Sequence, residues 1–351
     1  MDALKEIIKH APDDLEILNA WLVTDERLNN CHKALCSVSG GSDSDIVTHL
    51  CATLDKEQKV TYVFFDTGLE YQATKDQIAY LKQKYGIEII TARAEKPIPL
   101  CCKQYGVPFL SKLVSDYISR LQKHNFQWED RPYEELTEKY PRCSAALRWW
   151  CNAWGEGSRF NISHNPWLKE FMVQNPPQIK ICSKCCHYTK KVVAKKYIEA
   201  GGFDLNITGV RKAEGGLRAT AYKGCYTPGT EKTAAHFRPL FWFRQDTKRL
   251  YETHYDIRHS ACYETWGLKR TGCAGCPFAK NFEAELLAIE KYEPKLCKAL
   301  QKVFGASYEY TRKYRAFQKE MNAYQKNVRK RGAVAGTACK DLLSQVGRED
   351  V

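Results

Sequence analysis

Five cysteines lie in two short groups whose spacing could hold a metal. The first group is Cys182-Ser-Lys-Cys185-Cys186, and the second is Cys273-Ala-Gly-Cys276. Taken as two CxxC pairs, Cys182 with Cys185 and Cys273 with Cys276, they suggest a structural zinc site. However, the two groups are much farther apart than the roughly 15–20 residues of a zinc ribbon. An iron–sulfur cluster also takes four thiolates and does not need them close in sequence, so it is the favoured interpretation.

A second motif with chemical potential is Ser39-Gly40-Gly41-Ser42-Asp43-Ser44, which follows a short apolar run. Glycines between a strand and a helix let backbone N–H groups approach phosphate oxygens, and the helix N-terminus adds a positive dipole end. The hydroxyls of Ser39, Ser42 and Ser44 add hydrogen-bond donors. A Gly-Ser turn without function is the alternative, but the full motif after a buried strand is more specific. It predicts an anion site.

The elements needed to position this loop are a strand before it and a helix after it. Alternating strand and helix patterns at this spacing predict βαβ units and a parallel sheet with helices on both faces. The expected strands lie at 33–38, 60–65, 87–91 and 203–208, the expected helices at 45–54, 71–85 and 187–199, and a further apolar run at 239–243.

Shifts in composition divide the chain into five expected segments. These are an N-terminal helical segment (1–30), a nucleotide-binding half (31–96), a helical insertion or lid (97–180), a cluster- and anion-binding half (181–282), and a basic helical region (283–351).

Composition narrows the class of protein. The 351 residues include 16 cysteines and carry a formal net charge of +13. The first residues lack the features of a secretory signal, and no apolar run approaches the ~18 residues that span a bilayer. We therefore expect a cytoplasmic protein without a membrane partner, in which many cysteines indicate metal ligation or redox chemistry rather than disulfides. The positive charge favours an anionic partner, although solubility alone can explain it.

Much of the positive charge lies near the C-terminus. Residues 307–331 contain eight basic and two acidic residues. Apolar residues recur there at steps of three and four, which predicts a helix that docks by that stripe and turns its charges outward. A solvated face and a nucleic-acid surface both remain open. The stripe consists of Tyr310, Tyr314, Phe317, Met321, Tyr324 and Val328.

The glycine-rich loop resembles the PP-loop of the ATP pyrophosphatase superfamily, whose members cleave ATP between the α and β phosphates and adenylate a substrate. The resemblance implies that residues 39–44 bind ATP and that Asp43 is the carboxylate available for Mg²⁺. Asp66-Thr67-Gly68, after the second expected strand, resembles the adenine-pocket segment of the phosphoadenosine phosphosulfate reductase family. Together they imply an α/β, parallel-sheet adenine nucleotide alpha-hydrolase (Rossmann-like) fold with a helical insertion and a helical C-terminal region.

The cysteines resemble the cluster motif of adenylylsulfate-type reductases. This resemblance implies a [4Fe-4S] cluster held by Cys185, Cys186, Cys273 and Cys276, with Cys182 as a substitute ligand or a free thiol.

A third segment, from Gly209 to Arg218, resembles the family's Gly-x-Arg-x-x-Glu-x-x-x-Arg stretch that faces the phosphosulfate. It implies that Arg211 and Arg218 bind an anion, because guanidinium groups suit bidentate contact with sulfate or phosphate. Glu214 is then expected to orient an arginine, and surface ion pairing is the alternative for all three.

Two departures from the family bear on the reaction. Its assimilatory reductases end in a Glu-Cys-Gly-(Ile/Leu)-His segment whose cysteine attacks sulfur, whereas this chain has Gly336-Thr-Ala-Cys339-Lys-Asp. The complete PP-loop is also closer to ATP-cleaving relatives. The favoured function is therefore ATP-dependent sulfur transfer to an adenylated acceptor, a nucleic acid, peptide or metabolite. Sulfide, a persulfide or a cysteine desulfurase would supply sulfur, and the cluster, Cys182 or Cys225 would carry it.

Two alternatives stay open. One is reduction of adenylyl sulfate or phosphoadenylyl sulfate with release of sulfite, and the other is a non-catalytic nucleotide-binding iron–sulfur sensor.

Overall fold

The computed structural model describes residues 2–215, 220–231 and 233–346, with side-chain environments between residues 4 and 328 of these ranges. The chain divides into two compact units. The first consists of Met1–Gln104 and Lys184–Val303, and the second of Tyr105–Ser183 and Phe304–Val351.

A six-stranded sheet organises the first unit. Its strand order is β3-β2-β1-β4-β6-β5, and every neighbouring pair is parallel except β5 with β6. The predicted α/β fold with a parallel sheet is thus confirmed, with β5 as an antiparallel edge strand. The strands are β1 (Ala34–Ser37), β2 (Val60–Asp66), β3 (Ile89–Arg93), β4 (Leu205–Ile207), β5 (Tyr226–Thr227) and β6 (Ala235–Phe237).

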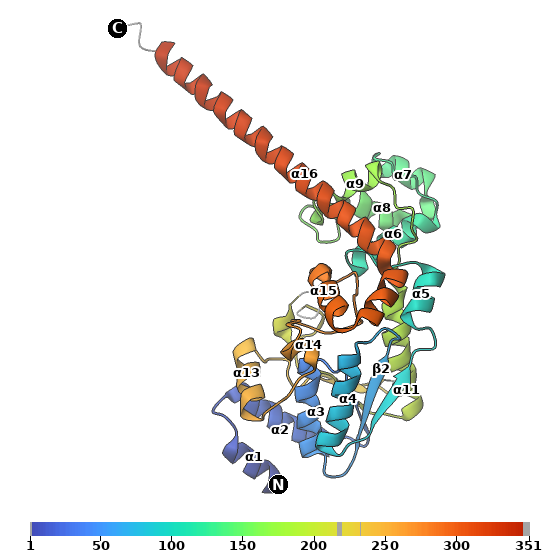
Figure 1. The fold of residues 1–351 in the computed structure, drawn as a ribbon, viewed down its shortest axis with the longest axis vertical. Helices are drawn as coiled ribbons and strands as arrows, with labels where there is room; N and C mark the ends of the chain where they lie inside the picture. The colour runs from blue at the N-terminus through green and yellow to red at the C-terminus, as the bar shows by residue number, and fades with distance from the viewer. Residues whose placement is uncertain (1, 216–219, 232, 347–351) are drawn as a thin grey trace. The chain divides into compact units, whose positions relative to one another are not determined.

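Helices cover both faces of this sheet because alternate strand residues point to opposite sides. Cys36 and Tyr62 face a core shared with residues of α2, α3, α4 and α13, whereas Leu35 and Val63 face α11. Figure 1 shows α3 and α4 side by side against the strands. The helices are α1 (Asp2–His10), α2 (Leu15–Asn29), α3 (Ser42–Leu54), α4 (Gln72–Tyr85), α5 (Ile98–Tyr105), α10 (Lys184–Cys186), the π-helix η3 (His187–Lys191), α11 (Val192–Gly201), η4 (Lys212–Glu214), α13 (Gln245–His254), α14 (Ala261–Glu264) and α15 (Phe282–Tyr292).

The apolar run 239–243 forms two consecutive turns instead of continuing the strand pattern. Phe241 N–H donates to the Arg238 carbonyl at 3.1 Å, and Phe243 N–H donates to the Leu240 carbonyl at 3.0 Å. Leu240, Phe241 and Phe243 are nevertheless fully buried. These apolar residues therefore fill the core after β6 has ended at Phe237. A short apolar run without periodicity does not show whether it forms a strand or a buried turn.

The second unit is helical, as expected for residues 97–180. Its core contains Trp149, Trp150 and Phe171, joined by Tyr310 and Tyr314 from α16. The elements are α6 (Lys112–Lys123), α7 (Tyr133–Lys139), η1 (Pro141–Cys143), α8 (Ser144–Trp150), η2 (Ile162–His164), α9 (Leu168–Gln174) and the later part of α16 (Pro294–Val346).

The apolar stripe on α16 docks over only part of its length. Tyr310 and Tyr314 are buried and Phe317 packs on the same core, but Tyr324 and Val328 are 66% and 49% exposed. The expectation that the whole stripe packs is therefore wrong beyond Phe317, where α16 meets no further core residue of its unit among those described. None of the described helices combines the length and apolarity needed to cross a bilayer.

Candidate functional site

A pocket opens where the strand order reverses, at the carboxyl ends of the adjacent strands β1 and β4. This switch point is where open α/β sheets bind ligands. The pocket has a volume of about 750 Å³, a size suited to a nucleotide. Its lining comes from the chain after β1 (Ser37, Ser39, Gly41, Ser42, Asp43, Ser44), the chain after β4 (Thr208, Gly209, Val210, Arg211, Glu214), α13 (Gln245, Lys248, Glu252), and Lys190, His259, Tyr263, Lys269, Arg270 and Thr271.

Side-chain and backbone bonds shape the loop between β1 and α3. Ser39 N–H donates to Ser44 Oγ at 2.9 Å, and Gly41 N–H donates to Ser39 Oγ at 3.3 Å. Gly40 has φ +63°, and a Cβ built there would lie 2.8 Å from Thr74 Cγ2. Gly209 approaches the backbone of Asp43 so closely that a Cβ would lie 3.0 Å from its carbonyl carbon. Glycine is therefore required at position 40, where the loop meets α4, and at position 209, where the segment after β4 meets the loop.

Gly40→Ala is expected to destabilise the protein more than Gly86→Ala. Both glycines have left-handed backbones, at φ +63° and +62°, but nothing lies within 4 Å of a Cβ at Gly86. The backbone cost of about 1–2 kcal/mol is common to both variants. Only Gly40→Ala adds the collision with Thr74, worth about 1–3 kcal/mol. Urea unfolding measures the difference, and equal losses would show that the loop can move away from α4.

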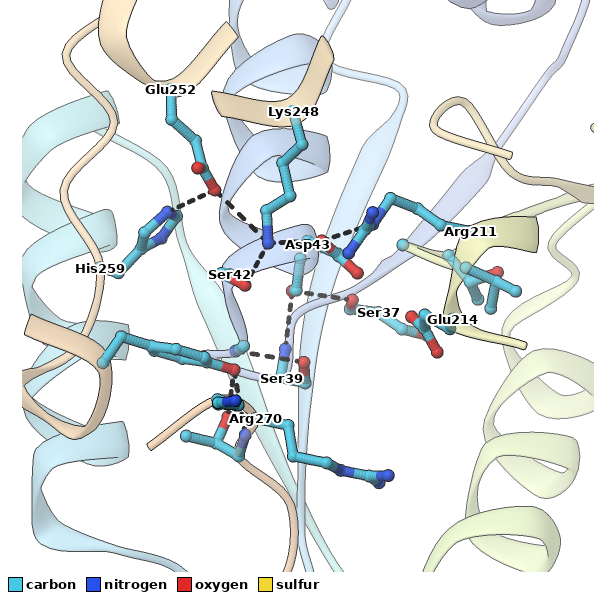
Figure 2. Close-up of a pocket in the computed structure, with 18 of the residues that line it drawn as sticks. Ser37, Ser39, Ser42, Asp43, Arg211, Glu214, Lys248, Glu252, His259 and Arg270 are labelled. Atoms are coloured by element: carbon cyan, nitrogen blue, oxygen red, sulfur yellow. Dashed lines mark hydrogen bonds and ion pairs between the residues drawn. The ribbon is translucent and has the colours of Figure 1, made fainter. Parts of the chain in front are cut away.

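Asp43 lies between two cations at the mouth of the pocket. Its Oδ1 is 2.9 Å from Arg211 Nε and 2.7 Å from Lys248 Nζ. Neither Asp43 Oδ1 nor Arg211 Nε makes a directed hydrogen bond, so these contacts are ion pairs of poor hydrogen-bond geometry. Lys248 also donates to Ser42 Oγ at 2.5 Å. Figure 2 shows Lys248 reaching toward the loop from one side of Asp43 and Arg211 from the other.

His259 joins this group to a buried carboxylate beneath it. Its Nδ1 is 2.8 Å from Asp45 Oδ2, and its Nε2 is 2.8 Å from Glu252 Oε1, which lies 3.4 Å from Lys248 Nζ. Burial by itself lowers the pKa of His259, but the bonds to Asp45 and Glu252 outweigh it and raise that pKa to about 9. Burial raises the pKa of Asp45. His259 is therefore an imidazolium at neutral pH, held between two acids.

This network predicts a pH dependence of stability. The pKa of His259 rises from 6.5 to about 9 on folding, so its contribution is complete below pH 6.5 and is lost as the pH rises through 9. The contribution is on the order of 3 kcal/mol. In His259→Gln, the unfolding free energy should fall less between pH 7 and 9.5 than in wild type. The exposed His32→Gln is the control, and parallel curves for wild type and His259→Gln would contradict the assignment.

The structure brings together most of the sequence-predicted anion ligands. Ser39, Gly41, the residues 42–44, Arg211 and Glu214 line the pocket, while Gly40 is turned toward Thr74 of α4. Arg218 lies outside the described residues. Five lysine and arginine side chains and three carboxylates are among the lining residues. The surplus of cations suits a polyanionic ligand.

Sequence reasoning missed Lys248, Glu252 and His259. Lys248 and Glu252 are four residues apart on α13, a spacing that places both on one helix face. That spacing was the available signal, but it is shared by many solvated ion pairs. No local pattern connects His259 to Asp45.

Asp66, Thr67 and Gly68 end β2 at the same edge of the sheet but do not line the pocket. Gly68 N–H donates to Asp66 Oδ1 at 2.8 Å, which forms a closed turn. The Thr67 hydroxyl bonds to Glu70 Oε1 at 2.6 Å and also interacts with the Cys273 thiol. This segment therefore contacts the second cysteine group.

The four predicted cluster ligands lie in one neighbourhood of the first unit. Cys185 hydrogen-bonds to Cys186 and interacts with Cys276, and Cys273 interacts with both Cys186 and Cys276. Cys185 also hydrogen-bonds to Cys102, a fifth thiol that the sequence analysis did not single out. The vicinal pair Cys101-Cys102 on α5, which parallels Cys185-Cys186, was the signal for it.

These thiols suit a metal in kind, but they do not form a ready-made ligand set. Burial raises the pKa of Cys276 to about 12 and also raises that of Cys273, so a bound cation is needed to deprotonate them. Lys190 hydrogen-bonds to Cys273 and interacts with Cys186, which offers a positive charge beside the thiols. Within the described parts of the chain, no three His, Cys, Asp or Glu side chains are arranged to hold a metal ion.

The two predicted sulfur-carrying thiols lie elsewhere. Cys182 belongs to the second unit, where it is buried and its N–H donates to the Val107 carbonyl at 2.9 Å. Cys225 is half-buried in the first unit, its carbonyl accepts a bond from Arg238 N–H at 2.7 Å, and it does not line the pocket. Cys339 lies on α16, beyond the described side chains.

Comparisons with curated proteins give one local and one long match. GMP synthase [glutamine-hydrolyzing] of Campylobacter lari is 43% identical over 65 residues, which is 18% of this chain and 12% of that protein. An uncharacterized protein of Methanocaldococcus jannaschii is 24% identical over 80% of this chain and 42% of its own length. The chain thus spans less than half of either relative.

Two solved structures are similar at low identity. The phosphoadenylyl-sulfate reductase of Candida auris has a TM-score of 0.41 at 11% identity, covering 77% of this chain and 93% of that one. A tRNA thiolase of Methanococcus maripaludis, solved with its [4Fe-4S] cluster, has a TM-score of 0.35 at 15% identity, covering 85% and 80%. The fold assignment rests on the strand order, not on these scores. At the level of sequence families, residues 33–159 match the model of the phosphoadenosine phosphosulfate reductase domain.

Proposed function

We propose that this chain is an ATP-dependent sulfurtransferase that adenylates its acceptor in the pocket between β1 and β4. One observation carries the proposal. Asp43 belongs to the complete loop 39–44, and its carboxylate contacts Arg211 and Lys248. The pocket that this loop lines has more cationic than anionic side chains. A triphosphate with Mg²⁺ would suit this arrangement, because Asp43 would hold the metal while Arg211 and Lys248 would bond to phosphate oxygens.

Each residue has a role in this reaction. The loop N–H groups and Lys248 bind the phosphates, Arg211 neutralises charge that develops as pyrophosphate leaves, and Asp43 binds Mg²⁺. An acceptor oxygen attacks the α phosphorus, and the bond from that phosphorus to the bridging oxygen breaks. A sulfur nucleophile then attacks the activated carbon, the carbon–oxygen bond breaks, and AMP leaves. Adenylation is needed because the unmodified oxygen is a poor leaving group.

The thiols of Cys185, Cys186, Cys273 and Cys276 would hold a [4Fe-4S] cluster, which supplies a site for electrons or sulfur close to the β2 end. If all four are ligands, no iron is open to sulfide. A separate thiol such as Cys182 or Cys225 would then carry the sulfur as a persulfide, taking the outer sulfur from a persulfide donor that leaves as a thiol. Exposed Lys313, Lys319 and Lys326 on α16 are the reason to include a nucleic acid among candidate acceptors.

A second function is favoured by the family match over residues 33–159, which names phosphoadenosine phosphosulfate reductase. In that case the pocket would bind adenylyl sulfate or its 3′-phospho form, and an external thiol would supply electrons for release of sulfite. A nucleotide sensor with a structural cluster is the third candidate.

One anaerobic incubation separates the three functions. The purified protein is mixed with ATP, Mg²⁺, sulfide and candidate acceptors, including RNA and DNA, and pyrophosphate is measured. A parallel reaction contains adenylyl sulfate or its 3′-phospho form with a dithiol, and sulfite is measured. Acceptor-dependent release of pyrophosphate supports sulfur transfer. Release of sulfite would instead support the reductase. If neither product forms but nucleotide binds tightly, the sensor is supported.

A further inference from the structure

Helix α15 and the residue after it place one carboxylate at the second cysteine group and another at the start of α4. Glu285 Oε1 accepts a bond from Gly275 N–H at 3.1 Å and another from the Tyr71 hydroxyl. Glu293, just after the helix, accepts bonds from Gln72 N–H at 3.0 Å and Ala73 N–H at 3.1 Å. Those two donors are otherwise unsatisfied groups of the first turn of α4. The same helix therefore contacts both the start of α4 and the cysteine turn.

Both residues inside the turn Cys273-Ala-Gly-Cys276 are held by other segments. Ala274 N–H donates to the Leu69 carbonyl at 2.9 Å, and Gly275 N–H donates to Glu285. Gly275 has φ +57°, a conformation that residues other than glycine adopt at a cost. The backbone between the two cysteines is thus bonded to segments outside the turn.

The support for Glu285 is itself rigid. Tyr71 and Ala274 are fully buried, and α15 packs through Phe282 and Ile289, which are also fully buried. The Tyr71 ring meets Trp266 edge to face at 5.6 Å, and Trp266 stacks on Tyr292 of α15 at 5.1 Å with a 2° interplanar angle. A carboxylate held by a buried phenol at the base of a packed helix has little freedom to leave Gly275.

We propose that Glu285 is the positioning residue of the cysteine turn, and that it fixes the backbone that carries Cys273 and Cys276. This inference rests on the proposed function only in taking the turn as metal-binding. Glu285 does not contact a thiol; it acts through the Gly275 amide, and Tyr71 fixes the carboxylate.

The first measurement uses the full-length, reduced and metal-free protein, so it does not depend on a cluster. Amide exchange is followed by mass spectrometry in the peptide that contains residues 272–278. Glu285→Ala should exchange at Gly275 about tenfold faster or more, because the amide loses its buried acceptor. Glu285→Gln retains an acceptor oxygen and should stay close to wild type. Glu290→Ala, an exposed position on the same helix, is the matched control.

The second measurement is iron per chain and absorbance near 400 nm after anaerobic reconstitution with iron and sulfide. Glu285→Ala should lose most of the iron, Glu285→Gln should retain it, and Glu290→Ala should match wild type. Tyr71→Phe removes the phenol donor but keeps the acceptor for Gly275, so a smaller loss of the same sign is expected even if Glu285→Ala folds poorly.

Unchanged exchange in Glu285→Ala, or full iron loading in that variant, would overturn the positioning role. A wild-type protein that takes up no iron would instead remove the cluster from the proposed function. The exchange result would still decide whether Glu285 holds the turn, so the two failures are distinguishable.

Discussion

Lys248→Ala is expected to weaken binding of ATP·Mg²⁺ about 100-fold and to reduce pyrophosphate release by at least as much. Lys248 Nζ is 2.7 Å from Asp43 Oδ1 and 2.5 Å from Ser42 Oγ, so its charge lies directly on the loop that would cradle the phosphates. A hydrogen bond to a charged group is worth about 1.5–3 kcal/mol, and loss of one preorganised donor typically costs a factor of about 10²–10³ in kcat. Calorimetric titration with ATP and Mg²⁺ gives the affinity.

Arg249→Ala is the matched control, because Arg249 is the next residue on α13, is exposed and does not line the pocket. It should bind ATP as wild type does. Near-UV circular dichroism of Lys248→Ala checks that loss of this partner of the Asp43 and Glu252 carboxylates has not unfolded the unit. A folded Lys248→Ala with wild-type affinity would show that the triphosphate binds elsewhere.

Cys273→Ala and Cys276→Ala are each expected to reduce the iron content of anaerobically reconstituted protein from about four atoms to less than one per chain. A cluster that loses one of four thiolates loses most of its binding free energy. The remaining buried thiols must still be deprotonated, and three metal–sulfur contacts offset that cost less than four do. Iron, zinc and acid-labile sulfide are measured together. Stoichiometric zinc without iron would exclude the cluster in favour of a zinc site.

Cys102→Ala and Cys297→Ala are the informative controls. Cys102 hydrogen-bonds to Cys185 but belongs to none of the predicted ligand pairs, and Cys297 is half-buried on α16. Both variants should retain iron. If Cys102→Ala loses iron while Cys276→Ala retains it, the ligand set would have to be reassigned to include the cysteine on α5.

The parts of the fold predicted from sequence are those with local signals. The buried strand 34–37, the glycine loop after it and the helix that starts at Ser42 follow from neighbouring residues alone. The secondary structure of residues 239–243 does not follow from the sequence, because a short apolar run packs equally well as a strand or as a turn. The apolar stripe on α16 predicts packing beyond Phe317 that the structure does not have, because helical periodicity does not show where a partner surface ends.

The sequence by itself determined which chemistry is available: the anion loop at 39–44, the arginine and glutamate after β4, and two groups of cysteines. Only the tertiary structure decided which groups act together. Lys248, His259, Cys102 and Glu285 reach their partners Asp43, Asp45, Cys185 and Gly275 from other elements. Apart from Glu285 and Gly275, which are ten residues apart, these pairs are distant in sequence. Such contacts arise from the packing of α13, α5 and α15 around the sheet, and no local spacing in the chain encodes them.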